Sequence, residues 1–362
     1  MLHHPQIIAD KHQSDWADRS ENWLSEIQKM QPRRRKRDRR EHPLILCGQG
    51  VSMRIEDNAL VIRDGFTHYP QEQARYRFFP ADRELPPRII LLDGSGTLSF
   101  DVLSWLGEQG VALARVKWSG EVAIAASGGG YSADAQKVEW QRSTRVDEGK
   151  RLAFSADLIS RKLSASLETL ASNFEPSKAR EYAIRRTEIA IDRLRTETFS
   201  KMVEIQSLEG ECAGAYFTAW QGLAIQWTGT NCKPIPDDWR TFNSRRTTLS
   251  QQKSTNGRAA HPVNAMLNYA YTVRQTQLQI DAVAEGYDPI QGIMHISQKG
   301  SPAYILDLIE PERPKVDAAI LKFIGERSFG AGDFLIRKDG VCRLSPQLAK
   351  MVAAKIAASS IT

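Results

Sequence analysis

The stretch Gly292-Ile-Met-His-Ile-Ser-Gln-Lys-Gly-Ser-Pro-Ala-Tyr-Ile-Leu-Asp-Leu-Ile-Glu-Pro-Glu-Arg-Pro314 combines a histidine with acidic and basic side chains. Glycines on both sides of His295 predict a turn or an irregular connection there. The apolar run that follows, from residue 303 to 309, predicts a helix. On such a helix the three-residue spacing of Asp307 and Glu310 places both carboxylates on one face.

These residue types point to a metal. An imidazole together with one or two carboxylates is a usual ligand set for a divalent cation such as Mn²⁺ or Mg²⁺. Lys299 and Arg313 lie close by in the sequence and are suited to holding a phosphate ester at such a metal. The same residues would also fit a surface loop followed by an ordinary helix with a polar face. A metal site needs a third ligand from elsewhere in the chain.

The predicted helix from Met202 to Trp220 offers that ligand. Glu209 falls inside its apolar stripe, whereas Glu204 and Glu211 fall well outside it. A carboxylate that faces a core is costly unless it meets a cation, a metal or a proton. The alternative is a carboxylate at the edge of the stripe that turns out to water. We predict Glu209 as the third ligand. The stripe itself consists of Ile205, Leu208, Cys212, Tyr216 and Ala219.

Composition sets the broad class. The chain has 362 residues, which predicts two domains, and its 41% hydrophobic and 25% charged residues are typical of a soluble globular protein. The formal net charge of +6 favours polyanionic partners. Four scattered cysteines without a Cys-x-x-Cys pair argue against a zinc knuckle or a disulfide framework and favour a reducing cytoplasm. The sequence has neither the order of a signal peptide nor an apolar run long enough to span a membrane.

Three regions follow one another. Residues 1–43 form a basic N-terminal extension, with seven Lys or Arg among the nine residues 32–40. This run is either a solvated linker or an arm that contacts nucleic acid. Residues 44–130 alternate apolar and polar side chains in short strands with one helix, which predicts a β-rich domain. Three glycines at 128–130 mark a hinge, and residues 131–362 carry the apolar stripes of helices.

A long polar connection runs from residue 222 to 260. Loops of this length are usually functional or mobile. Its arginines, Arg245 and Arg246 among them, are interleaved with aromatic residues and could grip a nucleic-acid backbone. The next helix begins at Pro262, and His261 before it is predicted to be a cap or a surface residue rather than a metal ligand.

Three segments together resemble one known family, the CRISPR-associated adaptation integrases, the larger of the two proteins that insert new spacers into CRISPR arrays. The segment Leu208-Glu-Gly-Glu-Cys-Ala-Gly-Ala-Tyr-Phe217 looks like that family's Glu-Gly-x-Ala-Ala-x-x-Tyr-Phe motif. His261-Pro-Val-Asn-Ala-Met-Leu-Asn-Tyr-Ala-Tyr271 looks like its Pro-Val-Asn-Ala-Leu-Leu-Asn-x-x-Tyr motif. The stretch from Gly292 to Pro314 resembles its Gly-x-x-His … Asp-Leu-x-Glu-x-x-Arg-Pro motif. The similarity covers residues 44 to 358; Cys212 replaces a common alanine, and the basic extension lies outside the usual pattern.

The resemblance implies an α+β multidomain fold, with a small N-terminal β-sandwich-like domain followed by a larger all-α catalytic domain, in a homodimer. By matching positions it assigns the catalytic metal ligands to Glu209, His295 and Glu310. Asp307 is then a neighbouring acidic residue, and Arg313 occupies the place of a basic residue near the DNA. The implied cofactor is Mn²⁺ or Mg²⁺.

The leading hypothesis is therefore a metal-dependent DNA endonuclease and integrase of a prokaryotic cytoplasm. The 3′-hydroxyl of an incoming double-stranded DNA fragment would attack a repeat phosphodiester in one transesterification. We expect Arg245, Arg246, Lys299 and Arg313 to contact the DNA backbone. The family implies a small ferredoxin-like adaptation partner.

Two alternatives stay open. One is a related transposon integrase, which tends to carry an additional C-terminal DNA-binding domain; this chain ends soon after Leu344-Ser345. The other is a non-catalytic DNA-binding scaffold, for which basic charge and arginine-bearing helices would suffice.

Overall fold

The computed structural model describes residues 21–27, 43–66, 73–116, 122–126, 133–245, 259–296 and 302–359. The basic run at 32–40 and the glycine hinge at 128–130 lie outside these ranges. The chain divides into two compact units. The first consists of Met1–Gly130, Gly332–Leu335 and Arg343–Thr362; the second consists of Tyr131–Ala331 and Ile336–Cys342.

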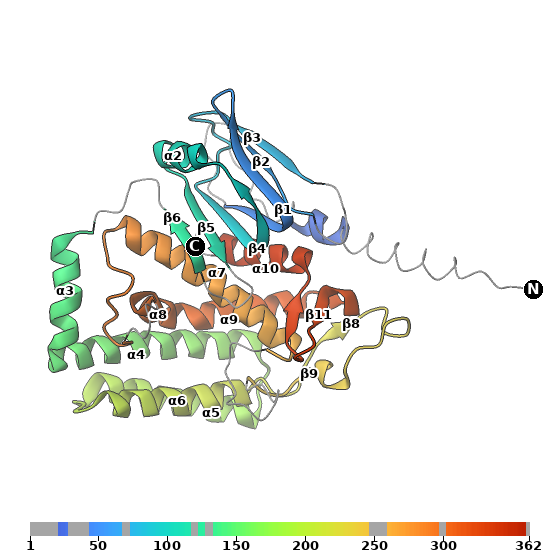
Figure 1. Cartoon of the computed structure of the whole chain (residues 1–362). Helices are drawn as coiled ribbons and strands as arrows, with labels where there is room; N and C mark the ends of the chain where they lie inside the picture. The colour runs from blue at the N-terminus through green and yellow to red at the C-terminus, as the bar shows by residue number, and fades with distance from the viewer. Residues whose placement is uncertain are drawn as a thin grey trace, which may run out of the picture. The chain divides into compact units, whose positions relative to one another are not determined.

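The first unit is built on one six-stranded sheet with the strand order β3-β2-β1-β4-β5-β6 (Figure 1). The central strand β1 pairs parallel with β4, which in turn pairs parallel with β5, and the other pairings are antiparallel. The turn between β1 and β2 places Asp57 and Asn58 at positive φ, as its Asp-Asn sequence favours. The strands are β1 (Leu44–Glu56), β2 (Ala59–Arg63), β3 (Arg75–Phe78), β4 (Arg88–Leu98), β5 (Ala112–Val116) and β6 (Val122–Ala126).

Both faces of this sheet are used. Leu44 and Leu46 of β1 pack in one core with Trp105 of helix α2 (Phe100–Glu108). Because side chains alternate along a strand, the next residue, Cys47, faces the other way, and its Sγ lies 3.8 Å from the carbonyl oxygen of Pro346. That proline begins helix α10 (Pro346–Ser359), whose Lys350 donates to Asp64 at 2.6 Å.

The predicted β-rich domain is therefore confirmed, and its sandwich-like form stays a prediction. Helix α10 belongs to this unit because of its contacts with β1 and Asp64. The helical unit consequently ends earlier than the predicted range of 131–362. Within the extension, residues 21–27 are helical, and the indole of Trp23 donates to Asp333 at 3.1 Å.

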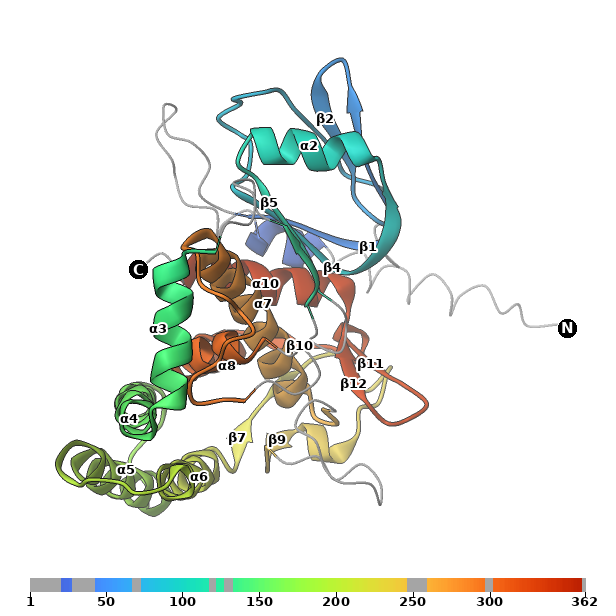
Figure 2. The same ribbon diagram turned by 60° about the vertical axis from the view of Figure 1, so that its left-hand side comes forward.

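The second unit is mostly helical. Its long helix α4 (Glu148–Asn173) packs against α5 (Lys178–Thr196) and α6 (Met202–Thr218), as Figures 1 and 2 show, and also against α9 (Arg313–Gly325). Side-chain caps begin two of these helices: Asp147 accepts from the backbone of α4 and Ser177 from that of α5. The other helical segments of this unit are α3 (Ala135–Val146), α7 (Pro262–Ala284), α8 (Ala303–Ile309), η1 (Asp237–Trp239) and η2 (Glu310–Glu312); the 3-10 helix η3 (Ala331–Asp333) begins in this unit and ends in the first.

The prediction of an all-α domain missed short β pairings. Strand β7 (Leu223–Ala224) pairs with β9 (Thr241–Phe242), and β8 (Gln226–Trp227) pairs with β10 (Ser328–Phe329). The long connection after α6 thus contains local structure. Two further short strands are β11 (Phe334–Ile336) and β12 (Cys342–Leu344). In the described part of the chain, no helix is long and apolar enough to cross a membrane.

Candidate active site

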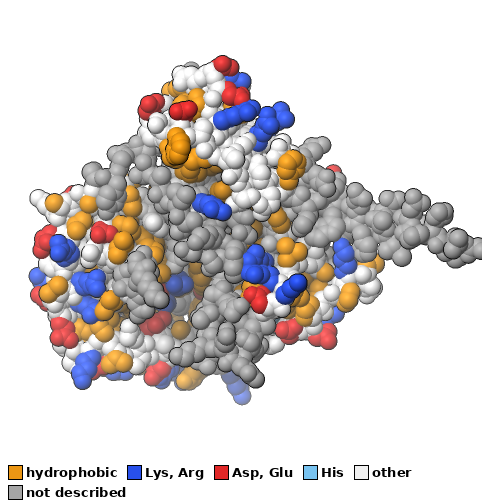
Figure 3. Space-filling view, in the orientation of Figure 1, with side chains coloured by type: hydrophobic (Ala, Val, Ile, Leu, Met, Phe, Trp, Pro, Cys, Tyr) orange, Lys and Arg blue, Asp and Glu red, His pale blue; other side chains and the backbone are white. Residues whose placement is uncertain are grey.

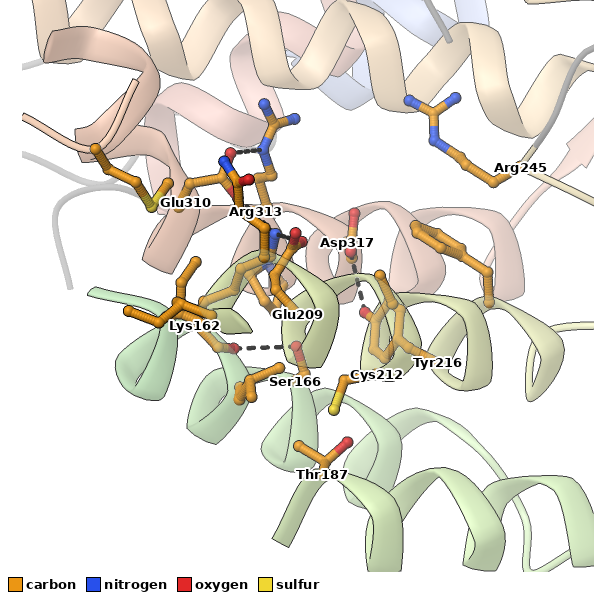
Figure 4. A pocket seen from close by; sticks show the side chains of 18 of the residues that line it. Lys162, Ser166, Thr187, Glu209, Cys212, Tyr216, Arg245, Glu310, Arg313 and Asp317 are labelled. Carbon is orange, nitrogen blue, oxygen red and sulfur yellow. Dashed lines mark hydrogen bonds and ion pairs between the residues drawn. The ribbon is translucent and has the colours of Figure 1, made fainter. Parts of the chain in front are cut away.

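A cavity of about 380 Å³ in the helical unit collects side chains from six of its helical segments and two of its loops (Figure 4). Glu209 comes from α6, Glu310 from η2, and His295 from the connection before α8. The three residues predicted as metal ligands therefore line one cavity, although they are far apart in the sequence. Their role as ligands stays a prediction.

His295 is held by a buried carboxylate. Asp307, with 0% of its surface exposed, accepts hydrogen bonds from the backbone N–H groups of Ile293 (2.6 Å), Met294 (3.2 Å) and His295 (2.9 Å). Its Oδ1 also lies 2.8 Å from His295 Nδ1. An ionised Asp307 makes Nδ1 the protonated nitrogen, so Nε2 keeps its lone pair for a ligand. Asp307 thus orients the imidazole. This role is more specific than that of a neighbouring acidic residue, which the family resemblance implied for Asp307.

The loop before His295 is fixed from two further sides. A Cβ on Gly292 would lie 2.4 Å from the carbonyl oxygen of His295, so only glycine fits this close approach. The guanidinium of Arg151, on α4, donates to the carbonyl oxygens of Ile293 (3.0 Å) and Met294 (3.2 Å). The irregular connection expected from the glycines is therefore an ordered bend that presents the histidine.

Glu209 is half-buried, whereas Glu204 and Glu211 on the same helix are exposed, as its place in the apolar stripe predicts. Its partner is Lys162 of α4, whose Nζ lies 2.5 Å from Glu209 Oε1 and 2.5 Å from Glu310 Oε2 (Figure 4). Only 14% of the Lys162 side chain is exposed. One ammonium group therefore joins the two carboxylates from α6 and η2.

Glu310 is surrounded by positive charge. Its second oxygen, Oε1, accepts from Arg313 Nε at 3.0 Å. Burial alone would raise the pKa of Glu310, but the charges and hydrogen bonds of Arg313 and Lys162 outweigh it and lower this pKa to about 2. Burial disfavours the ammonium of Lys162, yet Glu310 and Glu209 raise its pKa above the ordinary value. Both partners are ionised at neutral pH.

A buried polar cluster adjoins these residues. Asp317 accepts hydrogen bonds from the hydroxyl groups of Tyr216 (3.0 Å) and Tyr271. The guanidinium of Arg313 lies 4.9 Å from the centre of the Tyr271 ring, and that of Arg245 lies 5.8 Å from it. Burial raises the pKa of Asp317 to about 6, against the lowering effect of the two hydroxyl groups and the two arginines.

The predicted DNA contacts divide into two groups. Arg313 and Arg245 line the cavity, where Arg245 Nη2 donates to Asn268 at 2.7 Å. Arg246 and Lys299 lie outside the described residues. His261 caps α7 by accepting from the backbone N–H of Val263 at 3.2 Å, as predicted. Contact of any of these arginines with DNA stays a prediction.

Sequence reasoning missed two residues of the site, Lys162 and Asp317. Lys162 follows Leu158 and Ile159 at helical spacing and precedes Ser166, and all three of these are buried. The position of Lys162 in a buried helical stripe was the feature of the sequence that could have identified it as a residue of the site. Asp317 lies on α9 after the Arg-Pro of the quoted stretch, and its tyrosine partners come from the other two motifs.

The donor types fit a hard divalent cation, because two carboxylates and one imidazole nitrogen face one cavity. Among the described residues, no three His, Cys, Asp or Glu side chains already stand together as a metal-binding group. Glu209 and Glu310 instead meet Lys162, and both oxygens of Glu310 accept from cations. The residues therefore fit Mn²⁺ or Mg²⁺ by type and by shared cavity, with Lys162 between the two carboxylates.

Known proteins resemble this chain over most of its length. An endonuclease Cas1 of Methanospirillum hungatei is 27% identical over 333 residues, 86% of each chain. A Cas4 exonuclease/Cas1 endonuclease fusion of Rhodospirillum rubrum is 29% identical over 263 residues; the match covers 71% of this chain but only 41% of the fusion protein. Among solved structures, a casposase bound to its integration product superposes with a TM-score of 0.69 at 22% identity, covering 88% of this chain and 82% of the casposase. This last likeness shows a shared fold.

The family model described as CRISPR associated protein Cas1 matches residues 44–358. Those residues contain the six-stranded sheet, all three motifs and every residue of the cavity. The chain therefore belongs to the Cas1 family of CRISPR-associated proteins.

Proposed function

We propose that the protein is a metal-dependent DNA endonuclease and integrase that inserts new spacer DNA into a CRISPR array. The observation that carries this proposal is the shared cavity of Glu209, His295 and Glu310, three residues from three segments. Membership of the Cas1 family supports it, because relatives carry the name of CRISPR-associated endonuclease.

The roles of the residues follow from their contacts. Glu209, Glu310 and Nε2 of His295 would hold Mn²⁺ or Mg²⁺, with Asp307 orienting the imidazole. The cation supplies neutralisation of the scissile phosphate and stabilisation of charge on the leaving oxygen. Arg313 adds a fixed positive charge to the same cavity, next to Glu310. The 3′-hydroxyl oxygen of the incoming fragment would form the new bond to phosphorus as the bond to the leaving oxygen breaks. The hydroxyl proton would pass to solvent and the leaving oxygen would take one up, without a covalent enzyme intermediate.

We propose double-stranded DNA as the substrate, both as spacer precursor and as CRISPR repeat. The further partners are a second copy of this chain and a small ferredoxin-like adaptation protein, both of which rest on the family resemblance. Arg246, Lys299 and the basic run at 32–40 are candidates for additional DNA contacts. The compartment that suits these partners is the prokaryotic cytoplasm.

Strand transfer tests the proposal. A short duplex with free 3′-hydroxyls is incubated with a repeat-bearing plasmid in Mn²⁺, in Mg²⁺ or in chelator, with and without the small partner. We expect metal-dependent joining that Glu209→Ala abolishes. The matched control is Glu211→Ala, two residues further along the same helix, whose exposed side chain pairs with Arg186 outside the cavity. Full joining by Glu209→Ala would show that Glu209 is not a ligand.

A transposon integrase is the second candidate, because the casposase shares the fold. The two candidates differ in the DNA that they accept. Joining of a mobile-element end, with no preference for the repeat plasmid over a plasmid without repeats, would favour the transposon integrase.

A purely electrostatic scaffold has less support. On the face seen in Figure 3, the described Lys and Arg side chains are interspersed with Asp and Glu rather than gathered into one continuous patch. A scaffold also has no need for a histidine whose orientation is fixed by a buried carboxylate. Binding without joining in every metal condition would nevertheless restore the scaffold hypothesis.

A further inference from the structure

Lys162 stands where two of the proposed ligands meet. Its ammonium donates to Glu209 on α6 and to Glu310 on η2, both at 2.5 Å, while its own backbone belongs to α4. Charge-assisted hydrogen bonds of this length are among the stronger ones in proteins. Because the group is largely buried, water can replace these bonds only in part.

The two carboxylates have few oxygens left for a metal. Glu310 uses Oε2 for Lys162 and Oε1 for Arg313, so a metal ligand bond to Glu310 must compete with one of these cations. The ammonium of Lys162 also places one positive charge in a site that is proposed to bind a cation with two further positive charges. Repulsion between charges a few ångströms apart is strong in a partly buried site.

From this geometry we infer that Lys162 is the resident counter-cation of the metal site, and that its ammonium competes with a divalent cation for the carboxylates of Glu209 and Glu310. Lys162 consequently weakens metal binding while it stabilises the metal-free protein. This inference rests on the proposed function, because it assumes that Glu209 and Glu310 are metal ligands. It assigns a role to a residue outside the predicted ligand set.

The test is a titration of the full chain with Mn²⁺ alone, at neutral pH, without DNA and after removal of metals with chelator. Free Mn²⁺ is followed by electron paramagnetic resonance. The variants are Lys162→Met, which keeps the aliphatic stem, and Lys162→Arg, which keeps the charge. The control is Arg161→Met, because Arg161 is the next residue of the same helix and pairs only with the exposed Asp157, at 2.9 Å.

We expect Lys162→Met to bind Mn²⁺ roughly tenfold more tightly or better, because the metal then no longer competes with the charge-assisted hydrogen bonds of the ammonium. In chelator the same variant should melt at a lower temperature than the wild type, since two carboxylates lose their shared cation. Added Mn²⁺ should raise its melting temperature more than that of the wild type. Arg161→Met should leave the affinity within about twofold, and Lys162→Arg, which keeps the positive charge, should not show the tenfold gain.

The other possible results distinguish a failure of the inference about Lys162 from a failure of the proposed metal site. Binding of Mn²⁺ by the wild type and by Lys162→Met with equal affinity, or more weakly by the variant, overturns the inference and leaves the metal site intact. If neither protein binds Mn²⁺, the metal site of the proposed function fails, and the inference fails with it. Lys162→Gln repeats the comparison with a polar side chain should the Met variant lack the helical circular-dichroism signal of the wild type.

Discussion

Asp307 is the residue whose replacement tests the architecture of the site most directly. Its two oxygens accept four hydrogen bonds, three from backbone N–H groups and one from His295 Nδ1. Asparagine has nearly the same shape, but one of its two terminal atoms is a donor. In Asp307→Asn, at least two of the four donors therefore lose their acceptor, and the remaining bonds lose their charge.

The magnitude follows from this count. Hydrogen bonds to charged groups contribute about 1.5–3 kcal/mol each, so two lost bonds cost roughly 3–6 kcal/mol. For a unit of about 200 residues, 1 kcal/mol shifts the melting temperature by about 2–4 °C, which gives an expected drop of roughly 6–24 °C. Loss of an outer carboxylate partner of a metal-bound histidine typically lowers metal affinity by about 10- to 100-fold. We expect both effects together.

The assay combines thermal unfolding with hydrogen exchange at single amides. The amides of Ile293 and Met294 should lose protection in the variant, because both bond to Asp307 Oδ2. The control Asp157→Asn makes the same chemical change on α4, at an exposed carboxylate. A melting temperature within about 1 °C of the wild type, with the amides still protected, would refute the orienting role of Asp307.

Two further predictions concern pH in the metal-free protein and have opposite signs. The pKa of Glu310 is lowered from 4.5 to about 2, so its carboxylate contributes up to about 3 kcal/mol to the free energy of unfolding above pH 5 and loses this as pH falls through 2. Chemical denaturation should therefore show Glu310→Gln least destabilised, relative to the wild type, at pH 2. A difference in unfolding free energy that stays constant with pH would contradict this prediction. The pKa of Asp317 is raised by burial from 3.8 to about 6, so its contribution is complete below pH 3.8 and is lost as pH rises through 6. Asp317→Asn should therefore gain about 2 kcal/mol on the wild type between pH 4 and pH 7. A relative loss over that range would show that the pKa of the Asp317 carboxyl is not raised.

Prediction of burial from the sequence was most accurate for residues whose position depends on the period of a single helix. The stripe of α6 requires only the helical period, and it separated half-buried Glu209 from exposed Glu204 and Glu211. Asp307 and Glu310 were predicted on one helix, but Asp307 lies in α8 and Glu310 begins the following 3-10 helix η2. What each carboxylate contacts was beyond such reasoning, because their partners lie on α4 and in the bend at His295.

The assignment of α10 shows the same limit. Its apolar residues predict a helix, but periodicity does not say which unit covers them. Asp64 determines that α10 packs on the sheet. One of its oxygens accepts from the backbone N–H groups of Cys47 and Gly65, and the other accepts from Lys350 of α10. A buried carboxylate fixed in the sheet thus requires a cation, and the last helix supplies it from 286 residues away.

Lys162 was overlooked for a physical reason that also explains how the site is built. A lysine in an apolar stripe is usually read as a long stem that carries its charge out to water, whereas a glutamate in the same place demands a partner. In this cavity the lysine cannot reach water without giving up its bonds to two carboxylates, so it stays inside. Glu209 and Glu310 carry two negative charges, and Lys162 and Arg313 carry two positive ones. This balance lets the helical unit bury its acidic residues before any metal is present. Under the proposed function, a divalent cation has to compete with Lys162 for these two carboxylates.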